Sequence, residues 1–402
     1  MNPETVMNTE DLLQDSLAQT TLHPLNIRVR HASGSLLHLE DDTQVIDFIS
    51  GIGVSSFGHG HPLIVGALKN QIDKHLHVMV YGEMRQESQD LAAKMLCSLL
   101  PEKLDSVYFV NSGAEAVDGA LKLARSTTAR SKIMAVSGGY HGNTFGALSV
   151  SSSASRKAPF EPLLPDVDFI PWNDMESLDE IDGSCAAVIV ETIQGDAGVR
   201  IPSQAWLSGL RKKCDETGTL LILDEIQCGI GRTGRFFAFE HFGIEPDILC
   251  LGKALGGGLP MGAFVSSRSR MRKLASTPEL SHITTFGGHP LPCASSAAAL
   301  RLLQSLDFGE IEKNAKRFQD QIELHEAVSE VRRIGTYIAV ELKDAAAVAF
   351  CVEHALSNGL LIYFFLSTPN AFRVAPPLVM DDEMWQRATR ILLNTLDAYS
   401  AI

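Results

Sequence analysis

The stretch at residues 220–262 reads LLILDEIQCGIGRTGRFFAFEHFGIEPDILCLGKALGGGLPMG. It contains two short apolar runs, at 220–223 and 247–251, which we expect to form buried strands. Asp224 follows the first run, and Lys253 stands just beyond the second. Open α/β sheets bind ligands at the carboxyl ends of their strands, so Asp224 and Lys253 are predicted to face one site. A lysine in such a position is a candidate for Schiff-base chemistry.

Further apolar runs precede this stretch and alternate with segments of helical spacing; they lie at 106–110, 132–136 and 186–190. Continuous apolar strands that alternate with helices are typical of a doubly wound, mostly parallel sheet covered on both faces. We therefore predict an α/β fold, with a large domain over residues 51–304.

Beyond the large domain, the pattern of elements changes. A charged helix opens a mixed series of helices and strands, predicted at 310–325, 335–342, 345–358, 360–365, 372–374 and 382–399. This series predicts a smaller α+β domain over residues 305–402. At the other end of the chain, residues 1–20 are polar and predict an arm or a short helix. Short alternating stretches at 35–39 and 45–48 predict a hairpin.

The composition limits the class of partner and the compartment. The 402 residues carry a formal net charge of −14, which argues against nucleic acid or an anionic membrane as the main partner. The seven cysteines are scattered and never in C-x-x-C spacing, which is typical of reduced thiols. We find no basic and apolar signal peptide and no apolar run of the ~18–20 residues that a membrane span needs. We expect a cytoplasmic protein that acts on small molecules.

Two nucleotide-binding interpretations of the central stretch fail on context. GIGRTG at 229–234 matches G-x-G-x-x-G, but it does not directly follow a strand and it runs into aromatic residues, so an NAD(P)-dependent oxidoreductase is a weak alternative. LLILDE at 220–225 resembles a Walker B strand. Its P-loop partner is missing, because Ala254 stands where a serine or threonine should follow Lys253.

A metal site is not expected. His59 and His61 form an H-x-H pair, but no third ligand with suitable spacing is evident. Two loop histidines flanked by glycine and proline are the simpler interpretation.

Pyridoxal phosphate (PLP) chemistry fits the central stretch better. It needs a lysine for the Schiff base, an acid beside the pyridine nitrogen and a phosphate cradle. Lys253 supplies the lysine, which forms the Schiff base and can then carry a proton. Asp224 supplies the acid, because a nearby carboxylate raises the pKa of the ring nitrogen. Ser112-Gly113-Ala114 lie between a predicted strand and a helix, where exposed amides and a hydroxyl make an anion site. Ser112 and Glu115 also have capping-box spacing.

An ordered set of motifs resembles the class III PLP-dependent aminotransferases, the relatives of ornithine, acetylornithine and 4-aminobutyrate aminotransferases. The resemblance runs from about residue 23 to the end, and the set comprises NSGAEA (111–116), YHGNT (140–144), VIVETIQGDAG (188–198), LLILDEIQCGIGRTG (220–234), LCLGKALGGGLPMGA (249–263), TTFGGHP (284–290) and FRVAPPL (372–378). It implies the aspartate-aminotransferase fold (fold type I), with residues 1–50 joining the small domain. It also implies a homodimer with shared active sites.

The resemblance implies a reaction and a role for each matching residue. An amino group would pass from an amino acid or amine to a 2-oxo acid, such as 2-oxoglutarate or pyruvate, by a ping-pong mechanism. Lys253 would form the Schiff base and Asp224 would pair with the pyridine nitrogen. The other cofactor contacts would be Gln227 at the phenolic oxygen, Tyr140 and Ile226 on the two ring faces, and the phosphate ligands Ser112, Gly113, Ala114 and, from the second subunit, Thr285.

Departures from the family pattern concern the substrate. Asn143 stands where acetylornithine and ornithine enzymes typically carry an arginine, and an amide cannot replace a bidentate guanidinium. Asp196 replaces the usual glutamate that can pair with the arginine represented here by Arg373. We hypothesise that this shorter acid leaves Arg373 freer to bind an α-carboxylate. The candidate substrate-binding residues are thus Arg373, Asn143, Thr284 and Asp196.

The amino donor is not set by these residues. Some class III relatives are aminomutases or racemases, and the requirement for a keto-acid acceptor separates those reactions from transamination.

Overall fold

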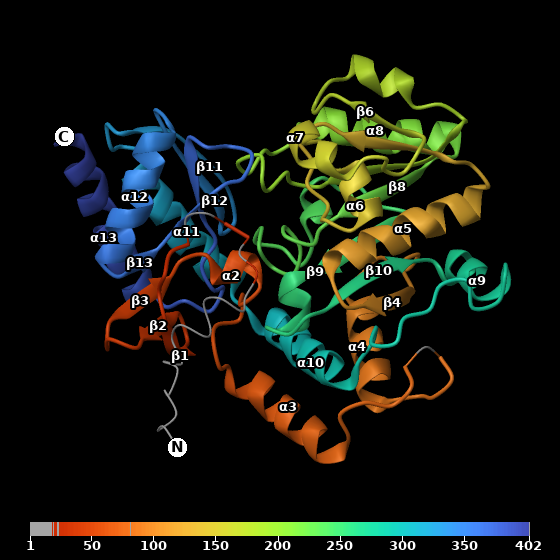
Figure 1. The fold of residues 1–402 in the computed structure, drawn as a ribbon, viewed down its shortest axis with the longest axis horizontal. Helices are drawn as coiled ribbons and strands as arrows, with labels where there is room; N and C mark the ends of the chain where they lie inside the picture. Colours follow the sequence, from red (N-terminus) through yellow and green to blue (C-terminus); the bar gives the residue numbers. More distant parts are fainter. Residues whose placement is uncertain (1–17, 19, 22–23, 81, 402) are drawn as a thin grey trace, which may run out of the picture.

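The computed structural model describes residue 18, residues 20–21, 24–80 and 82–401, and it is built around one large sheet (Figure 1). The predicted arm at 1–20 lies almost wholly outside these residues. Within them, the large sheet has the order β4-β10-β9-β8-β7-β5-β6. Its strands are β4 (Ser106–Val110), β5 (Lys132–Val136), β6 (Val167–Ile170), β7 (Cys185–Glu191), β8 (Leu220–Asp224), β9 (Ile248–Gly252) and β10 (Gly262–Ser266).

The large sheet is mostly parallel, as predicted. β10 is antiparallel to both of its neighbours, whereas the pairs β6–β5, β5–β7, β7–β8 and β8–β9 are parallel. Successive residues of β8 alternate between two cores: Leu221 and Leu223 face one, and Leu220 and Ile222 face the other. Strands buried on both faces read as unbroken apolar runs, which is why the sequence pattern was informative here.

Helices cover both faces of this sheet (Figure 1). α5 packs on β9 and β10 on one side, and α10 packs against α3 and α4 on the other. Several helices of this part begin at side-chain caps, such as Ser112 for α5 and Ser203 for α8. The helices are α2 (Ser50–Gly53), α3 (Pro62–Lys74), α4 (Glu87–Ser98), α5 (Gly113–Thr128), α6 (Phe145–Val150), α7 (Ala154–Lys157), α8 (Gln204–Thr217), α9 (Arg268–Ser276) and α10 (Pro290–Ser305).

The remaining elements form two smaller sheets and the helices around them. One sheet has the order β11-β12-β15-β14, and the other has the order β1-β2-β3-β13. Phe48, Phe318 and Trp385 meet edge to face in the core between them. The elements are β1 (Val29–Ser33), β2 (Leu36–Leu39), β3 (Gln44–Asp47), α11 (Phe308–Ile322), β11 (Val328–Ile334), β12 (Tyr337–Leu342), α12 (Ala345–Ser357), β13 (Leu360–Leu361), β14 (Tyr363–Phe364), β15 (Ala371–Val374) and α13 (Asp382–Ser400).

One sequence expectation is wrong in this part. The single strand predicted at 360–365 is two short strands that belong to different sheets: β13 pairs with β3, and β14 pairs with β15. An apolar run cannot show that its partner changes part-way. The hairpin predicted at 35–39 and 45–48 is confirmed as β2 and β3. The domain limits at residues 50 and 304 stay predictions.

The GIGRTG motif packs between the two parts of the molecule. Arg232, fully buried, donates hydrogen bonds to Ser56 Oγ at 2.8 Å, Thr336 Oγ1 at 2.9 Å and the Pro376 carbonyl at 2.6 Å. Gly335, at φ +56°, passes so close to Thr233 that a side chain there would overlap its backbone. The motif therefore packs the two parts of the molecule together and is not a dinucleotide-binding turn.

The two loop histidines have ordinary partners. His59 Nε2 lies 2.8 Å from Asp47 Oδ2, and His61 accepts the Leu63 amide at the start of α3. Among the residues that the structure describes, no three potential ligands gather as a metal ion would require. No helix of the described chain is both long and apolar enough to cross a bilayer.

Candidate active site

The carboxyl ends of β7, β8 and β9 lie side by side at one edge of the large sheet. Glu191, the last residue of β7, is paired with Asp224, the last residue of β8. β9 ends at Gly252, and Lys253 follows directly. The predicted placement of Asp224 and Lys253 at neighbouring strand ends is confirmed.

A cavity of about 490 Å³ opens at this edge. Its volume lies within the range of small-molecule sites. Eight of the residues singled out from the sequence line it: Gly113, Ala114, Tyr140, Asn143, Asp224, Ile226, Gln227 and Lys253. The other lining residues are His141, Gly142, Thr144 and Glu191.

Asp224 has a partner that the sequence did not reveal. Its Oδ2 lies 2.7 Å from Nδ1 of His141, whose side chain is fully buried, and its Oδ1 accepts the Ile226 amide at 3.0 Å. Among the residues that the structure describes, the other ring nitrogen of His141 has no partner and is buried. The imidazole therefore holds one carboxylate oxygen in a fixed direction. The signal in the sequence was its position beside Tyr140 in a strand-end loop.

Lys253 presents its amine at the floor of the cavity. Burial lowers the pKa of Lys253, and the negative charges of Asp224 and Glu191 partly offset that effect. A lower pKa leaves more of the amine uncharged, which a nucleophilic lysine requires. The backbone of Lys253 has φ +46°, in the left-handed region that residues with a side chain rarely adopt. Strain of this kind is typical of functional positions.

The first turn of α5 faces the same cavity. Ser112 caps the helix by accepting the Glu115 amide at 3.2 Å, and the amides of Gly113 and Ala114 have no intrahelical acceptor. Gly113 packs so closely on Ile226 that a β-carbon would lie 2.9 Å from its side chain. The turn thus offers two free amides and the positive end of a helix dipole, which is an anion-binding arrangement.

Glu191 ties two loops of the site together. Its carboxylate accepts the amide of Tyr140 at 2.9 Å and that of Gly195 at 3.0 Å. Burial raises the pKa of Glu191 from 4.5 to about 7. The Tyr140 hydroxyl accepts a hydrogen bond from Asn143 at 3.2 Å. Glu191 directly follows the apolar run predicted at 186–190, but the sequence does not reveal its role, because its contacts come from loops that the fold brings together.

Arg373 and Asp196 meet beside this cavity and do not line it. Arg373 Nη2 donates to Asp196 Oδ1 at 3.3 Å, and its guanidinium lies over the Phe365 ring at 4.5 Å. Its Nε is buried and has no partner in the described part of the chain. Asp196 has shorter bonds to the Leu366 amide, at 2.9 Å, and to Ser367 Oγ, at 2.6 Å. Asp196 and Arg373 thus pair despite the shorter acid, but Asp196 is held mainly by the 366–367 segment.

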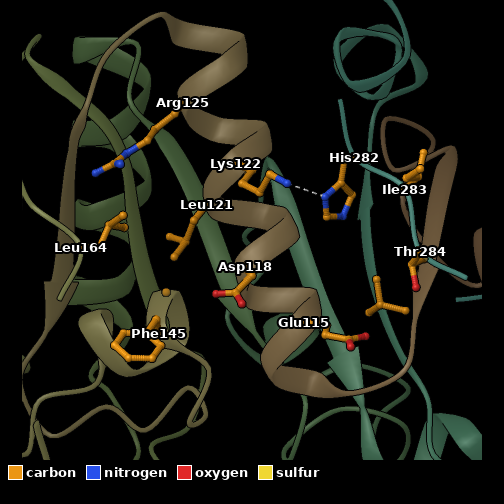
Figure 2. Close-up of a pocket in the computed structure, with 12 residues that line it drawn as sticks. Glu115, Asp118, Leu121, Lys122, Arg125, Phe145, Leu164, His282, Ile283 and Thr284 are labelled. Carbon is orange, nitrogen blue, oxygen red and sulfur yellow. Dashed lines mark hydrogen bonds between the residues drawn. The ribbon is translucent and has the colours of Figure 1, made fainter. Parts of the chain in front are cut away.

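Thr284 and Thr285 lie away from the cavity of their own chain. Thr284 accepts a hydrogen bond from Asn111 at 3.2 Å and lines a second cavity along the outer side of α5 (Figure 2). Figure 2 shows that cavity between Phe145 on one side and the 282–284 segment on the other. Thr285 is exposed. Neither threonine reaches Lys253 within one chain.

The sequence model of the family described as "Aminotransferase class-III" matches residues 17–396. The chain belongs to this family. It is therefore a PLP-dependent aminotransferase of fold type I, and the resemblance read from the motifs is confirmed.

Individual relatives agree with the family assignment. The class III chain is 37% identical over 397 residues to an acetylornithine aminotransferase of Methanopyrus kandleri, covering 98% of this chain and all of the relative. An ornithine aminotransferase structure from Toxoplasma gondii, with PLP at partial occupancy in its active site, superposes with a TM-score of 0.90 at 29% identity. It covers 99% of this chain and 96% of that one. A second structure of that enzyme gives a TM-score of 0.89 at 28% identity, with 99% and 97% covered.

Proposed function

We propose that the cavity at the carboxyl edge of the large sheet is the active site of this aminotransferase, with PLP held between Lys253, Asp224 and the first turn of α5. One observation carries the proposal: an amine, a carboxylate and two free helix amides face a single cavity of about 490 Å³. This is the set of groups that the cofactor needs at its aldehyde, its ring nitrogen and its phosphate.

The residues fit the cofactor in detail. Ser112, Gly113 and Ala114 would hold the phosphate, and the absence of a side chain at 113 lets the turn and Ile226 come together. Tyr140 and Ile226 would cover the two faces of the ring, with Gln227 at the phenolic oxygen. The buried Nε2 of the His141 imidazole has no partner among the described residues, so this imidazole is held at Nδ1 by Asp224.

The chain's own groups carry the acid–base work. PLP, when bound, supplies a ring that accepts electrons from a substrate carbon. His141 holds the Asp224 carboxylate in a fixed orientation through their 2.7 Å contact, so that this carboxyl group faces the cofactor nitrogen. Lys253, with its lowered pKa, takes up and returns a proton at Nζ.

Arg373 would bind the α-carboxylate of the amino acid and the 2-oxo acid. Its unpaired Nε and its single 3.3 Å bond to Asp196 leave donors available for a second carboxylate. We propose 2-oxoglutarate or pyruvate as the acceptor. Acetylornithine and ornithine are candidate donors because similar proteins are named for those substrates. Asn143, however, has no positive charge with which to bind a carboxylate of such a donor.

The functional unit is proposed to be a homodimer. Phe145, Ile283 and Phe286 are more than half exposed, and the first two border the cavity in Figure 2. Exposed apolar patches of this kind mark interaction sites. A second copy that covers this face would also account for Thr285, which would then join the partner's phosphate site.

Mixing variants tests the shared site. Lys253→Ala and Thr285→Ala homodimers should both have low activity, whereas mixed dimers regain one intact site and partial activity. A monomer in analytical ultracentrifugation at micromolar concentration would contradict the dimer.

A cytoplasmic location is proposed as well, since all seven cysteines are free thiols in the structure.

The experiment that tests the function combines colour and turnover. The purified protein should be yellow, and it should transfer amino groups to 2-oxoglutarate or pyruvate in a screen of amines and amino acids. A colourless protein that fails to take up added PLP would contradict the site. A PLP-loaded protein that needs no keto acid would instead indicate an aminomutase or a racemase.

A further inference from the structure

Asp196 lies between two arginines that come from distant parts of the chain. Arg373, on β15, contacts Oδ1 at 3.3 Å, and Arg156, on α7, lies 3.6 Å from Oδ2. The Asp196 side chain is 5% exposed. One buried carboxylate therefore faces two guanidinium groups. The three side chains together carry one uncompensated positive charge.

The single negative charge of Asp196 cannot neutralise both arginines. Its oxygens are already occupied by the Leu366 amide at 2.9 Å and by Ser367 Oγ at 2.6 Å, both shorter than its contacts with the arginines. A carboxylate has about four acceptor sites, so about two remain for the arginines, and its one negative charge balances only one of them. The positive charge beside the cavity is thus available to a bound anion.

Arg156 stands at the boundary of the cofactor cavity. Its Nη2 donates to the Leu366 carbonyl at 2.6 Å, and its Nη1 donates to Ser367 Oγ at 3.4 Å. It lines a small adjoining cavity of about 20 Å³ together with Tyr140 and Asn143, and these two residues also line the cofactor cavity. The charge of Arg156 reaches the Tyr140 hydroxyl, where it partly offsets the burial that raises the Tyr140 pKa.

We propose that Arg156 is a specificity-determining residue that binds the second carboxylate of a dicarboxylic substrate, while Arg373 binds the α-carboxylate. The inference rests on the proposed function. Asn143, which also lines the small cavity, offers an amide and no charge. Arg156 places a guanidinium where that charge is missing, with a third of its side chain exposed for a ligand.

A purely structural role is the alternative. Arg156 would then only fasten the 366–367 segment to α7, and its loss would weaken every substrate alike. The two roles separate in the comparison of ligands that differ by a single carboxylate.

The first test measures binding without turnover. Glutarate and pentanoate have the same carbon chain, but only glutarate has two carboxylates, and neither reacts. Calorimetric titration of the PLP-loaded enzyme should show glutarate binding about 10- to 100-fold more tightly, the range of one charge-assisted hydrogen-bonded pair. Arg156→Ala should abolish this preference. Arg156→Lys should keep part of it, and Asn143→Arg combined with Arg156→Ala should restore it.

The matched control is Lys157→Ala. Lys157 is the next residue of the same short helix, but its amine lies over the Phe169 ring at 4.3 Å and does not line either cavity. Its removal takes away a charge and should leave the glutarate preference within twofold of wild type. A wild type without a preference, or an Arg156→Ala enzyme that retains it, overturns the proposal. An equal loss for both ligands overturns it as well, in favour of the structural role.

Turnover provides the second readout. With 2-oxoglutarate as acceptor, Arg156→Ala should lower kcat/KM about 10- to 100-fold, mainly through KM, and with pyruvate it should change kcat/KM less than threefold. Equal losses with both acceptors overturn the specificity role. Absence of transamination by wild type would count against the proposed function alone, because the binding measurement still decides the role of Arg156.

Discussion

At the floor of the cavity, Asp224 has its two carboxylate oxygens bonded at 2.7 Å to the buried His141 imidazole and at 3.0 Å to the Ile226 amide. At the rim, within the chain that the structure describes, Arg373 has a 3.3 Å bond to Asp196 and a buried Nε with no partner. We define the floor as His141, Asp224 and Lys253, and the rim as Asn143, Arg156, Asp196 and Arg373. The floor comes from strand ends of one sheet and their adjacent loop. The rim draws on loops and strands from both parts of the molecule.

This difference separates reaction from substrate. Groups on neighbouring strands of a close-packed sheet have fixed positions, which suits chemistry common to a family. Side chains held by long contacts between the two parts of the molecule can exchange one partner for another, which suits the recognition of different carboxylates. Changes at the floor should therefore alter kcat, and changes at the rim should alter KM.

The largest effect is expected at the floor. Lys253→Ala should reduce kcat by about 10⁴-fold or more, because it removes both the nucleophile and the proton carrier. The visible absorption of the bound cofactor should change as well, which a spectrum can check. Thermal unfolding serves as the control and should be nearly unchanged. A variant that keeps most of its turnover would break the distinction between floor and rim.

The pair that holds the cofactor nitrogen should come next. Asp224→Asn should lower kcat about 100-fold or more, because the ring nitrogen loses the charge that keeps it protonated. His141→Asn should lower it about tenfold, since the carboxylate stays but its orientation relaxes. Steady-state kinetics with saturating substrates checks both. Equal losses for the two variants would show that the histidine does more than orient Asp224.

Two buried arginines sharpen the contrast between structure and recognition. Arg373→Lys should raise the KM for 2-oxoglutarate about tenfold or more and change stability little, because a lysine loses the guanidinium fork. Arg232→Lys should instead destabilise the fold by about 2 kcal/mol, because it leaves partners of three short bonds unsatisfied. Steady-state kinetics gives the KM of both variants for 2-oxoglutarate, and urea unfolding gives their free energies of unfolding. An unchanged KM for Arg373→Lys would remove Arg373 from the substrate site.

The smallest effect is a pH trend in stability. Burial raises the pKa of Glu191 and of Glu225 from 4.5 to about 7, so the folded protein binds these protons more tightly than the unfolded chain does. Their contribution is complete below pH 4.5 and is lost as the pH rises through 7. The melting temperature should fall by a few degrees between pH 5 and pH 8, and Glu225→Gln should flatten that slope. A melting temperature that rises over the same interval would show that other groups dominate.

The floor was largely readable from the sequence, and the rim was not. Asp224 and Lys253 follow apolar runs that had to be buried strands, and the parallel pattern places their ends at one edge. His141 was missed because its partner is 83 residues away and no local pattern encodes the contact. The same holds for Arg156, whose contacts with the 366–367 segment span more than half of the chain. The role of Thr285 depends on a second subunit, which one chain's pattern cannot describe.

The parallel pairing of β3 with β13 has a consequence for synthesis. Ile46 and Phe48 are fully buried, and Ile46 is aligned with Leu360, so β3 is completed by a strand near the opposite end of the chain (Figure 1). The ribosome releases β3 early and β13 close to the end of synthesis. The large sheet, by contrast, is complete once residue 266 has emerged. During translation the apolar faces of the first strands therefore stay uncovered until β13 has been made. Chains that terminate before residue 360 keep an unpaired β3 edge, which favours aggregation.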